Sequence, residues 1–155
     1  MRTFYPTPNT DTTHYLDLGA SVQLAATLHR FSLDAYHARL EYCITCIYRS
    51  HAEQARLYAQ GRTTTGKVVT NAKPGQSRHN DHLNGDPAST AVDMCPIIDG
   101  KPSWSKTGAA LVAWQKMGDI ASECGLEWAR NIAGMKHDWP HFQLPRTRAP
   151  NEGGK

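Results

Sequence analysis

The chain has 155 residues, of which 39% are hydrophobic and 20% charged, and its formal net charge is +3. These values predict a soluble globular protein with one core, and they exclude an intrinsically disordered chain. No apolar run approaches the length of a membrane helix, and the first residues lack the pattern of a secretory signal. The mild positive charge would suit a polyanionic surface, but ordinary surface Lys and Arg explain it better, because the sequence has no dense basic run.

The pattern of residues predicts a small α+β fold in a single domain over residues 1–155. Residues 41–48 alternate in the manner of a strand, and Ser50 with Glu53 forms a capping box that starts a helix ending at Gly61. The other expected elements are an irregular arm at 1–17, a helix at 19–30, a loop at 62–76, a strand at 91–98, a turn at 99–100, a helix at 106–124, short strands at 126–128 and 141–144, and a frayed tail at 145–155. We expect a short, mostly antiparallel sheet flanked by two or three helices.

The chain has four cysteines, at positions 43, 46, 95 and 124. Cys43-x-x-Cys46 would suit a redox motif or half of a structural zinc site. Cys95 and Cys124 are too far apart to supply the second close pair that a structural zinc site usually needs. We therefore expect reduced, mostly buried cysteines that act as small hydrophobic residues.

Two distant segments, 77–93 and 137–143, hold the residues of a candidate zinc site. Catalytic zinc needs three His, Asp or Glu ligands, an open position for water and a carboxylate beside that water. The chain lacks a local H-E-x-x-H motif, so these groups must come from separate segments. Pro140 favours an extended backbone at Trp139, which would let His141 lie on a strand with Asp138 close to the same water. Each segment alone also fits an ordinary surface loop.

Three short motifs carry a family resemblance: Ser77-x-His79, Ala91-x-Asp93 and Asp138-x-x-His141. In this order they resemble the signature of the zinc peptidases that cut cell-wall peptides containing D-amino acids. That family includes D-alanyl-D-alanine dipeptidases and carboxypeptidases and the phage L-alanyl-D-glutamate endolysins, with a hedgehog-like peptidase fold. The run from Tyr48 to Thr63 resembles their strand–helix segment, so the resemblance covers roughly residues 40–144.

The resemblance implies one zinc ion and a role for each site residue. The implied zinc ligands are His79, Asp93 and His141. Asp138 would be the general base, and Arg49 would stabilise charge on the scissile carbonyl oxygen. The implied substrate-binding residues are Ser77 and Gln54.

The chain departs from the family between the first two ligands. His79 and Asp93 are fourteen positions apart, and a shorter spacing is usual in the family. A turn-rich polar insertion of this kind could bulge without moving its ends, since loop length costs little free energy. It leaves His82 open as an alternative first ligand, and Asp81 and Asp86 as alternatives to Asp93.

His137 is the remaining imidazole beside the candidate site. It precedes Asp138 directly in the sequence. We expect it to lie beside the ligands without binding the metal, or to face solvent.

The resemblance implies a zinc peptidase that hydrolyses the stem peptide of peptidoglycan, most specifically an L-alanyl-D-glutamate endopeptidase acting as a monomeric phage endolysin. Such a protein would be made in the host cytoplasm without a signal peptide and released by a holin-type pore to act on the cell wall. The alternatives are a D-alanyl-D-alanine carboxypeptidase and a non-catalytic zinc-containing wall-binding module. A nucleic-acid-binding zinc module is disfavoured, because no basic stripe or second ligand pair is present, and we expect no membrane insertion.

Overall fold

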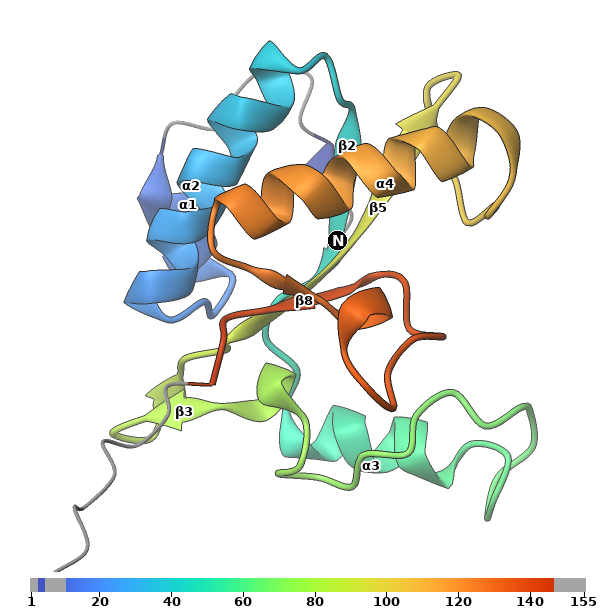
Figure 1. Ribbon diagram of the computed structural model, residues 1–155. Helices are drawn as coiled ribbons and strands as arrows, with labels where there is room; N and C mark the ends of the chain where they lie inside the picture. Colours follow the sequence, from blue (N-terminus) through green and yellow to red (C-terminus); the bar gives the residue numbers. More distant parts are fainter. Residues whose placement is uncertain (1–2, 5–10, 147–155) are drawn as a thin grey trace, which may run out of the picture.

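A six-stranded antiparallel sheet lies at the centre of the computed structural model, which describes residues 3–4 and 11–146 (Figure 1). Its strands follow the order β1-β2-β5-β8-β7, and β6 pairs with β5 outside this path. Their bounds are β1 Thr3–Phe4, β2 Tyr42–Cys46, β5 Ala91–Ile98, β6 Lys101–Pro102, β7 Glu127–Trp128 and β8 His141–Gln143. A separate hairpin pairs β3 His82–Leu83 with β4 Asp86–Pro87. The α+β class and the antiparallel sheet expected from the sequence are confirmed.

Four α-helices accompany the sheet in the described residues: α1 Thr12–Asp17, α2 Val22–His37, α3 His51–Ala59 and α4 Gly108–Glu123. Two short 3₁₀ turns, η1 Arg78–Asn80 and η2 Ala129–Asn131, lie near strand ends. Helices α2 and α4 pack against each other, and α4 packs on β5, whereas α3 lies apart from this layer on the other side of η1 (Figure 1). None of the described helices has both the length and the hydropathy needed to cross a bilayer.

The irregular arm expected at 1–17 is wrong for its last third, because residues 12–17 form α1. The Asp11 side chain accepts a hydrogen bond from Thr13 N and caps the helix, and Tyr15 is fully buried. The next helix begins at Val22, later than expected, because Ser21 caps it through Leu24 N. It also continues to His37, well beyond the expected end. The expected tail falls almost wholly on residues 147–155, which lie outside the described part.

The capping box at α3 is half present. Ser50 Oγ accepts a hydrogen bond from Glu53 N at 3.2 Å, as expected. The Glu53 carboxylate does not reach back to the Ser50 amide and instead accepts two hydrogen bonds from Arg56. Gly61 follows the helix with φ of +74°, a conformation open to glycine at little cost. The local signals therefore place this helix within a residue or two.

One hydrophobic core joins the sheet to α2 and α4. Trp128 stacks on Phe142 at a ring-centroid distance of 5.8 Å and on Trp114 at 6.4 Å. Gly118 of α4 faces Trp128 so closely that a Cβ there would collide with the indole ring. The indole Nε1 of Trp128 donates to Trp139 O at 2.7 Å, which ties the chain before β8 to this core. The core thus holds β8, the strand that carries His141.

Candidate metal centre and active site

Asp93 is the third residue of β5, opposite a β-bulge in β2. Cys43 pairs with Cys95 and Ile44 with Met94, but the register then slips so that Asp93 faces Cys46. A bulge inserts one extra residue and re-aims the side chains that follow it. Thr45 is that extra residue, and its hydroxyl donates to Asp93 O at 3.2 Å. The slip therefore turns Cys46 to the same face of the sheet as Asp93.

His79 is held by the residues that follow β2. It lies in η1, whose first turn is capped by Ser77 Oγ accepting from His79 N at 3.3 Å. Arg49 N donates to His79 O at 2.8 Å, and His79 Nδ1 lies 2.6 Å from Ile47 O. Because a carbonyl oxygen can only accept, Nδ1 carries the proton and Nε2 presents a lone pair to the site.

A tight turn brings Asp138 beside His141. The Asp138 carbonyl accepts from His141 N at 3.3 Å, with Trp139 and Pro140 between them. Met94 N donates to Pro140 O at 2.9 Å, which attaches the turn to the strand that carries Asp93. In β8, His141 is then the direct antiparallel partner of Asp93. The Asp-x-x-His spacing thus delivers a carboxylate and an imidazole to one place.

His141 is oriented by its neighbour two positions on. Its Nε2 lies 3.2 Å from Gln143 Oε1, and Gln143 Nε2 donates to Glu127 Oε2 at 3.1 Å. The amide oxygen can only accept, so His141 Nε2 carries the proton and Nδ1 is left with its lone pair. Sequence reasoning missed Gln143, although residues two apart on a strand share a face.

Three acceptor atoms therefore converge at the centre. His79 Nε2 lies 3.1 Å from both Asp93 Oδ1 and His141 Nδ1, and His141 Nδ1 lies 3.3 Å from Asp93 Oδ1. His79 and His141 are both buried. Two lone pairs and a carboxylate in such contact repel one another unless a cation lies among them. A proton or a metal ion can be that cation, and the donor set suits a metal.

The electrostatics agree with a site built for a cation. Burial would lower the pKa of His79, but the Asp93 carboxylate raises it to about 10. Burial would raise the pKa of Asp93, and the neighbouring His79 and His141 instead hold it far below its usual range. Asp138 is half-buried, and burial followed by the charge of Asp93 raises its pKa. A proton on His79 thus takes the place of a metal when none is bound.

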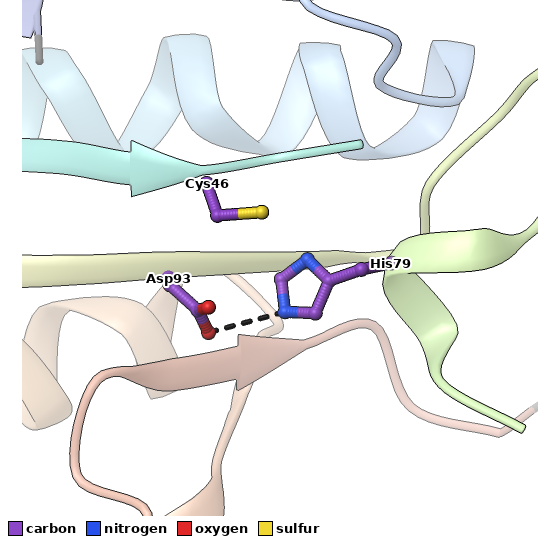
Figure 2. A group of neighbouring side chains, drawn as sticks. All are labelled: Cys46, His79 and Asp93. Atoms are coloured by element: carbon purple, nitrogen blue, oxygen red, sulfur yellow. Dashed lines mark hydrogen bonds and ion pairs between the residues drawn. The ribbon is translucent and has the colours of Figure 1, made fainter. Parts of the chain in front are cut away.

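Cys46 adds a sulfur atom to this group, as Figure 2 shows. Its Sγ, one nitrogen of His79 and one oxygen of Asp93 all lie within 4.8 Å of one another. Cys46 is partly buried and does not act only as a small hydrophobic residue, so that expectation is too narrow. Nothing in the sequence predicted this, because the bulge that aims it depends on pairing with β5.

Arg49 borders the centre on the side of Asp93. Its Nη2 lies 3.3 Å from Asp93 Oδ2 and 3.5 Å from Cys46 Sγ, and its Nη1 donates to Gln54 Oε1 at 3.1 Å. Gln54 is fully buried and also donates to Ala72 O at 2.8 Å. The expected substrate contacts of Gln54 and Ser77 remain predictions. In this structure Gln54 holds Arg49, and Ser77 holds the turn of His79.

The alternative ligands lie away from the centre. His82 is exposed on β3, where its Nε2 lies 2.9 Å from Tyr48 OH. Asp81 Oδ2 accepts a short hydrogen bond from Thr90 Oγ1, and Asp86 is exposed on β4. His137 is exposed beside Asp138.

The inserted residues form a hairpin whose base is closed. Ala88 N donates to Asp81 O at 2.9 Å, and Thr90 N donates to Arg78 O at 3.3 Å. The β3–β4 hairpin therefore projects from a closed base (Figure 1). This arrangement explains how fourteen positions separate His79 from Asp93 while their side chains meet at 3.1 Å.

Comparisons with known proteins agree with this architecture. Residues 18–142 match the family described as VanY: D-alanyl-D-alanine carboxypeptidase. The peptidoglycan L-alanyl-D-glutamate endopeptidase CwlK of Bacillus subtilis (strain 168) is 35% identical over 105 residues, which are 68% of this chain and 61% of that relative. The match thus spans less than two thirds of CwlK. The crystal structure of Serratia marcescens L-Ala D-Glu endopeptidase ChiX covers 88% of each chain with a TM-score of 0.58 at 18% identity, a likeness of fold.

Proposed function

Because the chain belongs to the VanY family of D-alanyl-D-alanine carboxypeptidases, we propose that it is a zinc-dependent peptidase acting on the stem peptide of bacterial peptidoglycan. Residues 1–155 would then form a single peptidase domain. One observation carries the proposal: His79 Nε2, His141 Nδ1 and Asp93 Oδ1 meet with lone pairs facing one another. This donor set is typical of catalytic rather than structural zinc.

The distances support a zinc ion in this position. Ligand atoms about 2.0–2.1 Å from zinc at tetrahedral angles are about 3.3 Å apart. The three measured separations of 3.1, 3.1 and 3.3 Å are close to that value. Hydrogen bonds to Ile47 O and Gln143 Oε1 orient the two imidazoles, as outer partners do at zinc sites.

In the proposed reaction, His79, Asp93 and His141 hold a zinc ion that supplies Lewis-acid activation of water and of the scissile carbonyl. Asp138 takes the proton of the attacking water on a carboxylate oxygen and returns it to the leaving amine. Its raised pKa suits that exchange, because a base works best when its pKa lies nearer the working pH. Arg49 places a fixed cation beside the centre, where it can stabilise charge on the carbonyl oxygen.

The bond between L-Ala and D-Glu is the proposed target. The support is the 35% identity to CwlK, whose name states that activity. The family description favours the second candidate, a carboxypeptidase that removes the terminal D-Ala. Both reactions use the same centre, and they differ in how the substrate lies across it.

The proposed setting is lysis by a phage. The protein would be a monomeric endolysin, made in the host cytoplasm and admitted to the wall by a holin-type pore. Its net charge of +3 would favour approach to the polyanionic wall.

Digestion of purified peptidoglycan tests the activity. The wild type, the isosteric Asp138→Asn variant and chelator-treated protein are compared, with the products identified by mass spectrometry and zinc measured in each sample. New amino-terminal D-Glu supports the endopeptidase, whereas released D-Ala selects the carboxypeptidase. Asp138→Asn should keep its zinc and lose about 10²–10⁴-fold in rate. A folded, zinc-loaded wild type that releases neither product would refute the enzyme and leave a wall-binding module.

A further inference from the structure

The β2–β5 strand pair holds two cysteines that take no part in the candidate metal site. Cys43 and Cys95 are direct partners in the antiparallel register, and both are fully buried. Their sulfur atoms lie 3.2 Å apart, and no disulfide joins them. All four cysteines of the chain lie within the described residues.

The backbone at this position suits a covalent bond between them. Ile97 N donates to Glu41 O at 2.9 Å, which makes Glu41 and Ile97 a hydrogen-bonded pair of the ladder. Two residues further along each strand, Cys43 and Cys95 form a pair of the same kind. Such pairs have Cα atoms about 5.5 Å apart, which falls within the usual Cα–Cα range of about 4.4–6.8 Å for disulfides. The sulfur atoms need to approach by only about 1.1 Å to reach bonding distance.

The other two cysteines have different neighbours. Cys46 lies beyond the bulge, where its Sγ accepts from Arg49 Nη2 at 3.5 Å. Cys124 follows α4, and its Sγ donates to Asp34 Oδ2 at 3.4 Å. The contacts of Cys46 and Cys124 therefore leave Cys43 and Cys95 as the pair placed for a bond.

We propose that Cys43 and Cys95 are a modification site that forms a cross-strand disulfide when the chain folds in an oxidising compartment. Two S–H bonds are replaced by one S–S bond, and the two electrons and two protons reduce a partner disulfide to two thiols by thiol–disulfide exchange. Because both sulfur atoms are buried, the exchange occurs before the strands have closed. This proposal does not rest on the proposed function: a chain that folds in a reducing cytoplasm keeps both thiols, and the bond forms only where the chain folds or refolds under oxidising conditions.

The bond ties together the two strands that carry the candidate metal centre. Asp93 lies two positions before Cys95 on β5, and Cys46 lies three positions after Cys43 on β2. Because the sulfur atoms move little, zinc content should not change. The link closes a loop of 52 positions in the unfolded chain, so the midpoint of thermal unfolding should rise by roughly 10 °C.

The test refolds the reduced, denatured full chain in a glutathione redox buffer and counts thiols after denaturation. Trypsin leaves Cys43 and Cys46 together on residues 40–49 and Cys95 on residues 79–106, because the bond between Lys101 and Pro102 resists cleavage. A Cys46→Ser/Cys124→Ser double variant therefore isolates the pair, and Cys95→Ala removes it. Folded wild type treated with the same buffer measures whether burial blocks the exchange.

The wild type should fall from four thiols to two and yield residues 40–49 joined to residues 79–106. The double variant should lose both of its thiols and show the rise in unfolding midpoint, which a reductant reverses. Cys95→Ala should show neither the joined peptide nor the rise. Four remaining thiols, glutathione adducts alone, or a Cys43–Cys46 bond would each overturn the proposal. These readouts are independent of peptidase activity, so they separate this proposal from the proposed function.

Discussion

Gln143→Leu should weaken zinc binding by about 30-fold without unfolding the protein. Among the described residues, the side-chain oxygen of Gln143 is the acceptor that His141 Nε2 meets, at 3.2 Å, and both residues are buried. Leucine removes that acceptor and leaves a buried N–H without a partner, which costs about 1–3 kcal/mol. A central cost of about 2 kcal/mol corresponds to about a 30-fold loss of affinity. Removing the hydrogen-bond partner of a metal-bound histidine typically costs about 10–100-fold in metal affinity.

The measurement is the apparent zinc dissociation constant, from competition with a chromogenic chelator at constant pH and salt. Gln143→Glu is the matched control, because it keeps an acceptor for His141 Nε2. Because position 143 is buried and lies beside Glu127, the new carboxylate should lower the free energy of unfolding, so stability is measured alongside zinc affinity; the affinity should fall less than in Gln143→Leu. If Gln143→Leu kept its wild-type dissociation constant while folded, the inference that Gln143 orients His141 toward a metal would be wrong.

Three further perturbations follow from the site and the core. In the metal-free protein, burial opposes but Asp93 raises the pKa of His79 to about 10. Its contribution to stability should be complete below about pH 6.5 and be lost as the pH rises through about 10, as urea titrations across that range can measure. Zinc must displace the same proton, so calorimetry should detect proton release on zinc binding. The zinc affinity should also rise about tenfold per pH unit from about pH 7 to 9, and a zinc affinity that did not change with pH would contradict this. Arg49→Lys should lower the peptidase rate by about 10–100-fold with zinc content unchanged. The reason is that a lysine ammonium cannot reproduce the guanidinium fork that contacts Asp93 and Gln54. A wild-type rate would remove Arg49 from the mechanism. Gly118→Ala should lower the free energy of unfolding by about 1–2 kcal/mol, because the added methyl group collides with the indole packed on α4, and an unchanged thermal midpoint would show that the contact yields.

Signals that lie close together in the chain determined much of the fold by themselves. Ser50 begins α3 and Gly61 follows its end, since a side-chain cap and a positive φ depend on neighbouring residues. The alternation in 41–48 placed β2, and the apolar stripe of 106–124 placed α4. The arm at 1–17 failed because the cap at Asp11 stabilises only a short helix, whose remaining support is the burial of Tyr15 in the core.

At the candidate centre, the sequence identified the site residues, whereas the tertiary structure determined how they are arranged. The sequence named His79, Asp93 and His141, whose side chains meet in the structure. It also named Asp138, whose pKa responds to burial and to the charges of Asp93 and His141. Their roles in binding zinc and in catalysis remain predictions.

Sequence left His79 and His82 as alternatives, because both are imidazoles in the same loop. The choice depends on contacts between distant segments, and only His79 is held by Ile47 O and Arg49 N against Asp93. His82 is carried away by a hairpin that closes on itself.

Two further side chains were decided only by strand pairing. Cys46 turns toward Asp93 because β2 bulges where it meets β5, and a bulge leaves no local mark in this stretch of sequence. Cys43 and Cys95 meet because the same two strands pair in one register, across 52 positions of chain. Local chemistry determined which elements form, whereas register and bulge, which depend on the whole sheet, determined which side chains meet.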